Sequence, residues 1–488
     1  MIVNTSEMKY LENESGDSEY ILMERVGNAL YTKMNSYVQQ NFKICILVGV
    51  GNNGGDALVL ARLFQKEHDV KVILVCGKPK TLSASKNLEL LPKHLIVSKK
   101  NWISTIEESD VIIDGVFGFS YHGELHTDTS KLFQQINQLN KTVYAIDINS
   151  GCEADTGICC KNALRSAVTF PIEYAKPFHL LQKEHHMFQK YECVSIGLPK
   201  LEKPTYLEMN EESFFAHFPK KQDNAYKNTY GKTLFVSGSY GMAGAASLNI
   251  IGAKTMGASY IDVVLPESIY PIVASQHITP VFHPTNDRNQ LEILLPLIQN
   301  AKAIGFGSGC TNLNRANDIL DCILQNATCP IVLDAFALRL LKQNTWIFRF
   351  TKAPVILTPH IGEFSYITNQ PIPYIHEHLI PCAKQFAQKN KIVLVLKGAN
   401  TVVAFPNGEC YINQSGNQAL AQAGSGDLLT GILTSILTMT RDITHAVCMA
   451  VWIHGHLADI GLNNYAMQTF SLDSYPTLMN SLFKKHNF

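Results

Sequence analysis

The residues with the clearest chemical potential are the run AGSGD at positions 423–427, which leads directly into an apolar segment, Leu428 to Leu437. Small residues before a helix let backbone N–H groups turn towards an oxyanion, and the positive end of the helix favours negative charge. Asp427 would lie there as a carboxylate that can accept a proton from a substrate hydroxyl. The same run is also ordinary helix-capping chemistry, so it predicts either an anion hole with a base or a simple N-cap.

A second group of polar residues follows three short, β-rich segments in the first half of the chain. These residues are Asn52, Asn53 and Asp56 after residues 43–50, Asp114 at the end of residues 110–114, and Asp147 and Ser150 at and after the end of residues 142–147. Helix-length segments separate the three strands, which is typical of a parallel sheet with right-handed crossovers. Ligands of such sheets bind beyond the carboxyl ends of the strands, although two neighbouring asparagines are also common in turns.

The loop GVGNNG at residues 49–54 matches the dinucleotide fingerprint G-x-G-x-x-G. That fingerprint requires an acidic residue at the end of the next strand, where it binds the ribose. Here the next strand ends in Cys76, Gly77 and Lys78, so a bound nicotinamide used for redox chemistry is not supported. What remains is a loop whose oxygens can hold a cation while its N–H groups meet phosphate.

The whole chain has 488 residues, which predicts two or three α/β domains. Lys plus Arg and Asp plus Glu number 41 each, so neither nucleic acid nor an anionic membrane is an expected partner. No apolar run approaches the roughly 18 residues that cross a bilayer, and no secretory signal opens the chain, so we expect a cytoplasmic protein. The twelve cysteines include no C-x-x-C pair, and most are expected to be reduced.

Composition changes between residues 197 and 230, which are richer in Pro, Lys, Glu and Asn, and this segment predicts a domain junction. The predicted domains are residues 1–210 and 222–488. The first begins with a predicted helix over residues 8–40.

In the second half, five strands end in small or polar residues. They end near residues 238, 307, 334, 357 and 397, the last with Lys397 to Thr401 at a bend. Taken singly, His360 could be a loop histidine, Glu363 a helix cap and Lys397 a solvated lysine. His454 and His456 are two apart on a helix and face different ways, so they are not expected to bind a metal.

The first half resembles the NAD(P)H-hydrate epimerase domain, a Rossmann-like three-layer αβα fold, through four motifs: MERVG (23–27), VGVGNNGGDALVLAR (48–62), DGVFGFS (114–120) and AIDINSGCEADTG (145–157). The resemblance implies potassium at Asn53, Asp114 and Ser150, and a catalytic, substrate-binding Asp147. Further substrate contacts implied are Asn52, Asn53, Gly54, Gly55, Asp56, Gly118, Phe119, Ser120, Tyr121, His122, Gly123 and Glu124. The chain departs from the family pattern at Ala57, Asn149 and Phe178, where Gly, Pro and Gly are usual.

The second half is similar to the ADP/ATP-dependent NAD(P)H-hydrate dehydratase, a ribokinase-like αβα fold, through GSYGMAGAA (238–246), GFGSG (305–309), LTPHIGEF (357–364), LKGANT (396–401) and AGSGDLLTG (423–431). The resemblance implies that Asp427 is the catalytic base and that the hydrated nucleotide touches Ala245, Gly309, His360 and Asp427. It places ADP or ATP, with Mg²⁺, against Lys397, Gly398, Ala399, Asn400, Thr401 and Gly426. Ala423 stands where the family commonly has glycine.

Together the resemblances imply a homo-oligomeric metabolite-repair enzyme whose substrates are hydrated NADH and NADPH (NADHX and NADPHX) and ADP or ATP. One domain would interconvert the R and S epimers, and the other would dehydrate the S epimer. Two alternatives stay open: a ribokinase-like small-molecule kinase fused to a nucleotide-binding module, and a first domain that only binds, as in mRNA-decapping scaffolds.

Overall fold

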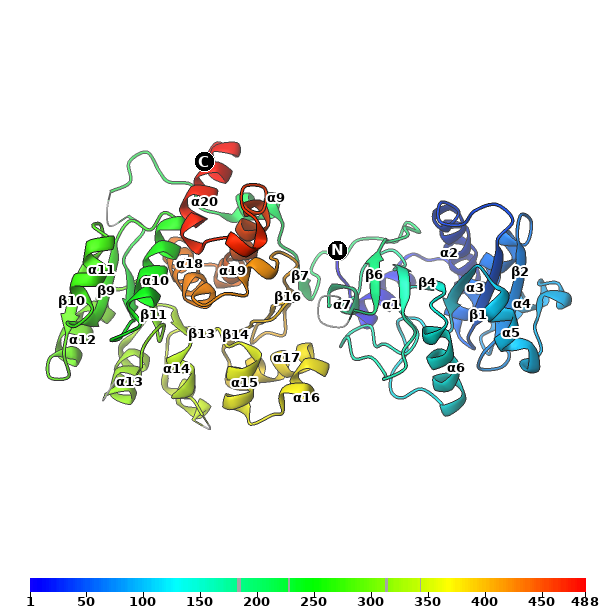
Figure 1. Ribbon diagram of the computed structural model, residues 1–488, viewed down its shortest axis with the longest axis horizontal. Helices are drawn as coiled ribbons and strands as arrows, with labels where there is room; N and C mark the ends of the chain where they lie inside the picture. The colour runs from blue at the N-terminus through cyan, green and yellow to red at the C-terminus, as the bar shows by residue number, and fades with distance from the viewer. Residues whose placement is uncertain (182–185, 227–228, 312–314, 343) are drawn as a thin grey trace. The chain divides into compact units, whose positions relative to one another are not determined.

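The computed structural model describes residues 1–181, 186–226, 229–311, 315–342 and 344–488, and the chain divides into two compact units, Met1–Tyr206 and Leu207–Phe488 (Figure 1). Residues 227–228 of the predicted junction lie outside the described residues. The predicted domain limits, 1–210 and 222–488, stay a prediction.

The first unit contains one sheet of six parallel strands in the order β2-β1-β3-β4-β5-β6 within its described residues. Its strands are β1 (Lys43–Val48), β2 (Asp69–Leu74), β3 (Val111–Gly115), β4 (Thr142–Ile146), β5 (Ser166–Phe170) and β6 (Phe188–Tyr191). Its helices are α1 (Thr5–Glu14), α2 (Glu19–Met34), α3 (Asn52–Phe64), α4 (Leu82–Glu89), α5 (Trp102–Glu108), α6 (Thr127–Gln138) and α7 (Pro177–Leu180).

The single helix predicted over residues 8–40 is wrong in detail, because two helices occupy most of that range. Gly16 has a φ of 71°, in the left-handed region that glycine tolerates, and so interrupts the helix. The Ser18 side chain then accepts a hydrogen bond from the Ile21 N–H and caps α2.

The core of this unit lies on both faces of its sheet. Along β1, Ile44, Ile46 and Val48 pack into one apolar cluster with α2 and α3, while Cys45 and Leu47 pack into another with α5 and α6. Because neighbouring side chains of a strand point to opposite faces, a strand buried throughout requires a helical layer on each side. The predicted three-layer αβα architecture is confirmed.

The second unit contains a sheet of ten strands in the order β10-β9-β8-β11-β12-β13-β14-β15-β16-β7 within its described residues. The strands from β10 to β14 are parallel, and β15 and β16 add antiparallel pairs. The strands are β7 (Tyr206–Leu207, where the two units join in sequence), β8 (Thr233–Val236), β9 (Ile261–Pro266), β10 (Val281–Thr285), β11 (Ala303–Phe306), β12 (Ile331–Leu333), β13 (Val355–Leu357), β14 (Val393–Leu396), β15 (Val402–Ala404) and β16 (Cys410–Ile412).

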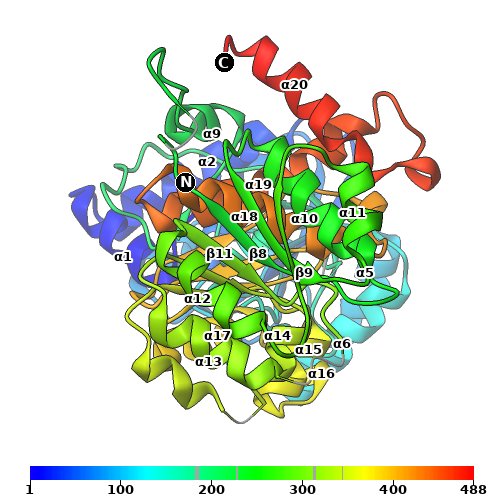
Figure 2. The ribbon, with the colours of Figure 1, turned by 90° about the vertical axis from the view of Figure 1, so that its left-hand side faces the viewer.

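Helices cover both faces of this sheet, with α10, α18 and α19 over one and α12, α13 and α17 over the other (Figure 2). The helices are α9 (Glu211–His217), α10 (Ala243–Thr255), α11 (Tyr270–Gln276), α12 (Gln290–Asn300), α13 (Ala316–Asn326), α14 (Phe336–Arg339), α15 (Ile361–Thr368), α16 (Ile372–Glu377), α17 (Leu379–Asn390), α18 (Ser425–Met439), α19 (Ile443–Gly461) and α20 (Tyr475–Lys485). Among the described residues, no helix is both long and apolar enough to span a membrane.

Two glycines let α10 and α18 cross at close range. A Cβ at Gly252 would lie 2.4 Å from the Leu428 carbonyl oxygen, and one at Gly431 would lie 2.3 Å from that of Asn249. Neither helix therefore tolerates a side chain at the crossing. As a result Asn249, on α10, reaches the first turn of α18, where Asp427 lies.

Candidate active sites

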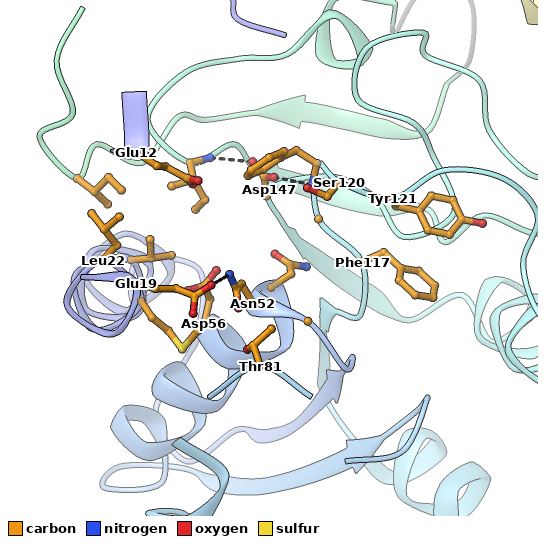
Figure 3. A pocket seen from close by; sticks show the side chains of 18 of the residues that line it. Glu12, Glu19, Leu22, Asn52, Asp56, Thr81, Phe117, Ser120, Tyr121 and Asp147 are labelled. Atoms are coloured by element: carbon orange, nitrogen blue, oxygen red, sulfur yellow. Dashed lines mark hydrogen bonds between the residues drawn. The ribbon is translucent and has the colours of Figure 1, made fainter. Parts of the chain in front are cut away.

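The first unit holds a cavity of about 620 Å³ beyond the carboxyl ends of β1, β3 and β4 (Figure 3). Nine predicted residues line it: Asn52, Asn53, Asp56, Gly118, Phe119, Ser120, Tyr121, His122 and Asp147. Six predicted residues do not line it: Gly54, Gly55, Asp114, Gly123, Glu124 and Ser150. The strand-end rule therefore brings most of the predicted site together.

Asp147 is held in a strained and fully bonded position. Its φ is 61°, which is uncommon for a residue with a side chain. Its carboxylate accepts hydrogen bonds from the Phe119 N–H (3.0 Å), the Ile172 N–H (3.2 Å) and the Lys176 ammonium (2.6 Å). These contacts fix the carboxylate at the wall of the cavity.

Lys176 is a residue that the sequence analysis missed. Its side chain is fully buried, and its ammonium donates to Asp147 and, over 2.9 Å, to the Ile172 carbonyl. Next to it, His179 contacts the Asp147 carbonyl at 2.8 Å, and burial lowers its pKa to about 4, so His179 is neutral at pH 7. Lys176 could have been found from the sequence, because it lies two residues before Phe178, where the chain departs from the family pattern.

Asp114, Ser150 and Asn53 form the predicted potassium set. The Asp114 carboxylate accepts from the Ser150 N–H (2.8 Å) and the Ser150 hydroxyl (2.6 Å), and burial raises its pKa to about 6. Asn53 is buried, and its Nδ2 has no hydrogen-bond partner among the described residues. The buried Asp114 carboxylate, which has no paired cation among the described residues, and the side-chain oxygens of Ser150 and Asn53 are the kind of ligand that suits a monovalent cation. The unpaired Asn53 Nδ2 is a hydrogen-bond donor and would not contact that cation.

Gly54 and Gly55, which follow β1, serve close packing and do not line the cavity. A Cβ at Gly54 would lie 2.2 Å from the Gly49 carbonyl oxygen, and one at Gly55 would lie 2.4 Å from the Met23 side chain. The loop is therefore pressed against its own strand and against α2, which leaves the polar side chains of Asn52 and Asp56 at the cavity.

The cavity is completed by residues of α1 and α2, which the sequence analysis did not assign. They include Glu12, Glu19, Leu22 and Met23. Glu19 accepts hydrogen bonds from the Asn52 amide and from the Ser83 hydroxyl, and so joins α2 to the loop after β1. The motif MERVG lies on this helix, and its presence was the signal that the helix belongs to the site.

In the second unit, Asp427 lies in the first turn of α18. Gly424 is the N-cap residue with a φ of 92°, a conformation that suits glycine, and no side chain makes a capping hydrogen bond. Ala423, just before it, is not among the residues with positive φ, so its methyl group is tolerated. The departure at Ala423 therefore causes no backbone strain before α18.

The Asp427 side chain is partly buried among polar neighbours. Burial raises its pKa to about 6, the charge of Asp334 raises it further, and a hydrogen bond from Ser308 opposes this. Asn249 donates to the Asp427 carbonyl (2.7 Å) and to the Ser308 hydroxyl (3.1 Å). Asn249 and Ser308 therefore position the carboxylate, although neither was predicted.

Lys397 lies next to the anion hole. Its ammonium is 3.1 Å from the position that a Cβ at Gly426 would take, and it donates to Asp334 over 2.9 Å. Asp334 also accepts from the hydroxyls of Thr358 (2.8 Å) and Thr430 (3.1 Å). Burial alone would raise the pKa of Asp334, but the Lys397 ammonium outweighs burial and lowers it. This cluster fixes a positive charge beside Gly426.

The remaining predicted residues surround the same edge of the sheet. A Cβ at Gly309 would lie 2.5 Å from that of Ala245, so these two predicted substrate residues touch. His360 forms a parallel bridge with Lys397 and lines a cavity of about 340 Å³ with Glu363. Glu363 both caps α15 and contributes to the charge around Asp427, so the helix-cap interpretation of this residue is also correct. Among the bend residues, Asn400 is buried, whereas Gly398 and Ala399 are exposed.

The histidines His454 and His456 take part in no metal cluster. His454 is buried and contacts the Ser425 hydroxyl at 3.3 Å, and His456 stacks on Trp452. Across the described part of the chain, no group of three or more His, Cys, Asp or Glu residues could hold a metal ion. The side chain of His454 instead supports the anion-hole loop.

Two family models match the chain. The NAD(P)H-hydrate dehydratase model matches residues 233–477, half of the chain, and the model described as YjeF-related protein N-terminus matches residues 19–178. The chain belongs to the NAD(P)H-hydrate dehydratase family.

Individual relatives support both halves. A bifunctional NAD(P)H-hydrate repair enzyme of Moorella thermoacetica is 29% identical over 489 residues, covering 94% of this chain and 92% of that protein. The ADP-dependent (S)-NAD(P)H-hydrate dehydratase of Bacillus subtilis is 33% identical over 275 residues, covering 56% of this chain and 97% of that protein. A crystal structure of the Bacillus subtilis ADP/ATP-dependent NAD(P)H-hydrate dehydratase, co-crystallised with ATP and Mg²⁺, aligns at 32% identity with a TM-score of 0.52. The alignment covers 57% of this chain and 97% of that chain. The predicted resemblance and the ribokinase-like fold are confirmed.

The departures from the family pattern in the first unit are accommodated by their surroundings. The Ala57 methyl group fits because residue 115 is glycine: a Cβ at Gly115 would lie 2.4 Å from the Ala57 Cβ. Phe178 packs edge-on against Phe188. The buried Asn149 amide donates to the Leu164 carbonyl (2.8 Å) and the Ser166 hydroxyl (3.0 Å), and its oxygen accepts from Thr169 (2.6 Å). Each departure therefore has its own packing or hydrogen-bond partners.

The expectation that most cysteines are reduced is confirmed for ten of the twelve, which are free. The exceptions are Cys152 and Cys159, which form a disulfide across the segment that follows Ser150. Neither cysteine belongs to a C-x-x-C motif, so their pairing was not predicted.

The buried pair formed by Asp334 and Lys397 makes a stability prediction. Asp334→Asn should lower the free energy of unfolding by about 3 kcal/mol or more, because it leaves a largely buried ammonium without its counter-charge. Chemical denaturation followed by circular dichroism measures this loss. Asp318→Asn is the matched control, since the Asp318 pair with Arg315 is exposed and should contribute about 0.5 kcal/mol or less. Equal losses in the two variants would contradict the assignment.

Proposed function

We propose that this chain repairs hydrated NADH and NADPH with two active sites. The first unit interconverts the R and S epimers, and the second dehydrates the S epimer at the expense of ADP or ATP. The observation that carries the proposal is the placement of Asp427 in the first turn of α18 together with the Lys397 ammonium beside Gly426. That arrangement combines a base, an anion hole and a fixed positive charge, which phosphoryl transfer to a hydroxyl requires.

In the second unit Asp427 takes the proton of the substrate hydroxyl as the hydroxyl oxygen attacks the terminal phosphoryl group. The bond between that phosphorus and the nucleotide breaks, and the backbone N–H groups of Gly424 to Gly426 stabilise the charge on the transferred group. Phosphate is a better leaving group than hydroxide. Its departure with a ring proton restores the double bond.

Lys397, Gly398, Ala399, Asn400 and Thr401, with Gly426, are the proposed nucleotide contacts. Ala245, Gly309 and His360 are the proposed contacts of the hydrated nucleotide. Asp334 already accepts hydrogen bonds from three side chains, so Mg²⁺ would be held by the phosphates and by water. Bound Mg²⁺ supplies neutralisation of the phosphate charge.

In the first unit the proposed substrate contacts are the loop residues Asn52 to Asp56, the loop residues Gly118 to Glu124, and Asp147. The proposed potassium ligands are Asn53, Asp114 and Ser150, whose oxygens fit a monovalent cation as described above. A cation there would keep the buried Asp114 ionised. Because Asp114 also accepts the Ser150 hydroxyl, cation binding would order the loop that follows Asp147.

A pH dependence follows from the environment of Asp427. The base must be ionised to accept a proton, and burial raises its pKa to about 6. We therefore expect kcat/KM of the dehydratase to be constant near neutral pH and to fall as the pH drops through about 6. Initial rates between pH 5 and 8, corrected for spontaneous loss of substrate, measure the profile. A profile that is flat down to pH 5 would rule out a base with this pKa.

The proposed function is tested by adding the mixed hydrate epimers with ADP or ATP in turn and following the return of reduced-nicotinamide absorbance. Formation of reduced nicotinamide from both epimers supports two active sites. Accumulation of a phosphorylated substrate without elimination would favour the small-molecule kinase instead. Recovery of the S epimer alone would mean that the first unit only binds.

The proposal includes a cytoplasmic location and a homo-oligomeric state. The substrates are cytoplasmic coenzyme derivatives, and the formal charge balance offers no membrane attraction. Cell fractionation and light scattering test these two points.

A further inference from the structure

Glu12, on α1, faces the epimerase cavity and has no role among the predicted residues. It lines the same cavity as Asn52 and Asp147, and Figure 3 shows its side chain directed towards Asp147. Its backbone carbonyl accepts a hydrogen bond from Ser15, whereas its carboxyl group has no hydrogen-bond or ion-pair partner among the described residues. The carboxyl group is therefore available to a bound molecule.

Two hydrogen bonds hold the chain at the start of α1, and a third joins one of their partners to Asp147. The Val3 N–H donates to the Ala175 carbonyl (3.0 Å), next to Lys176. At the start of the helix, the Thr5 hydroxyl donates to the Phe119 carbonyl (3.3 Å), and the Phe119 N–H donates to Asp147 (3.0 Å). The backbone of Phe119 thus links the helix that carries Glu12 to the carboxylate of Asp147.

The two carboxyl groups have different electrostatic surroundings. Burial, Asp147 and Glu19 raise the pKa of Glu12, and Lys176 and Lys9 lower it. The net result is a pKa of about 7. Asp147 lies 2.6 Å from the Lys176 ammonium, whereas the Glu12 carboxyl group has no ion-pair partner among the described residues. Burial raises the pKa of a further acid of the cavity, Asp56, well above its usual range. Glu12 lines the cavity with a carboxyl group that has no partner among the described residues and a pKa near neutral, so it can both give and take a proton there.

We propose that Glu12 is a second catalytic residue of the epimerase site and exchanges a proton with the substrate opposite Asp147, an inference that rests on the proposed epimerase function. The substrate hydroxyl is on ring carbon C6, which is bonded to ring nitrogen N1. Asp147 removes the hydroxyl proton, and the O–H bonding pair becomes the second bond of a C6 carbonyl. The C6–N1 bond breaks, its pair moves to N1, and Glu12 gives N1 a proton.

Rotation about the C5–C6 bond then presents the other face of the carbonyl. N1 attacks that face as Glu12 takes its proton back, and Asp147 returns its proton to the oxygen. The product is the opposite epimer. No oxidant, reductant or other reactant is consumed.

The test compares Glu12→Gln with Glu14→Gln, a matched variant on the exposed end of the same helix. Glu12→Gln should lower epimerase kcat/KM about a hundredfold or more, and Glu14→Gln should leave it unchanged. In the wild type the epimerase rate should fall as the pH rises through about 7, because Glu12 must start protonated. Glu12→Gln should lose that pH dependence. Dehydratase activity on the S epimer reports whether each variant is folded.

Each outcome is decisive. A Glu12→Gln variant with the wild-type rate, or with a lower rate and the wild-type pH profile, would overturn the role of Glu12 while leaving the epimerase function intact. A wild-type chain that interconverts epimers no faster than they interconvert spontaneously would overturn the epimerase function, and this inference with it. If Glu12→Gln does not fold, Glu12→Asp is the second variant. It should have a lower epimerase rate with the wild-type pH dependence, and loss of that pH dependence would count against the proposal.

Labelled water tests the bond that breaks. Ring opening keeps the hydroxyl oxygen on C6, so product from a single turnover in ¹⁸O-water should remain unlabelled. One labelled oxygen per epimerised molecule would show that water leaves and returns, and would overturn ring opening.

Discussion

Replacing Asp427 by asparagine should lower the dehydratase rate about a hundredfold or more, because the substrate hydroxyl would lose the base that takes its proton. Asparagine keeps the shape of the side chain and can still meet the Ser308 hydroxyl, so the loop before α18 should keep its conformation. The measurement is the return of reduced-nicotinamide absorbance from the S epimer with ADP or ATP in excess.

The epimerase is the internal control for Asp427→Asn. Chiral chromatography of the hydrate should show that the variant still interconverts the R and S forms at the wild-type rate. A variant that dehydrates the S epimer at the wild-type rate would remove Asp427 from the role of base.

Asp147→Asn should have the opposite effect. The R epimer should be repaired only at its spontaneous rate, because the carboxylate that accepts the hydroxyl proton is lost, while the S epimer is repaired normally. The change also leaves the buried Lys176 ammonium without its counter-charge, which should destabilise the first unit by about 3 kcal/mol.

A second substitution, Lys176→Met, separates the effect on stability from the effect on catalysis. It removes the ammonium charge that asparagine at position 147 cannot balance. Asp147→Asn combined with Lys176→Met should recover stability but not epimerase activity. Recovery of R-epimer turnover in the double variant would show that Asp147 acts only through the packing of the first unit.

The sequence predicted the edge of each sheet better than it predicted the helices that close the sites. Parallel strands end at a common edge, so Asn52 and Asp147, far apart in the chain, could be placed together. Glu12 could not be placed, because its position depends on how α1 is fastened to Phe119 and Ala175. Contacts between side chains that are distant in sequence leave no periodic pattern.

The same limit applied to buried charges. Lys397 and Asp334 each follow a strand, and Lys397 could equally have been a solvated lysine. Only the folded chain shows that the two pair. The backbone conformation excludes a side-chain cap at the start of α18, and the anion hole stays a prediction. Gly424 is the N-cap and no side chain caps the helix, so the Asp427 carboxylate is free to face Ser308.

The central claim is that one chain carries two active sites that work in sequence, and a time course started from the pure R epimer with ADP or ATP tests it most directly. We predict that the S epimer appears first and is then consumed as reduced nicotinamide accumulates, much faster than R converts spontaneously. With Asp427→Asn, the S epimer should accumulate instead. Reduced nicotinamide that forms from R only at the spontaneous rate of epimerisation would contradict the account.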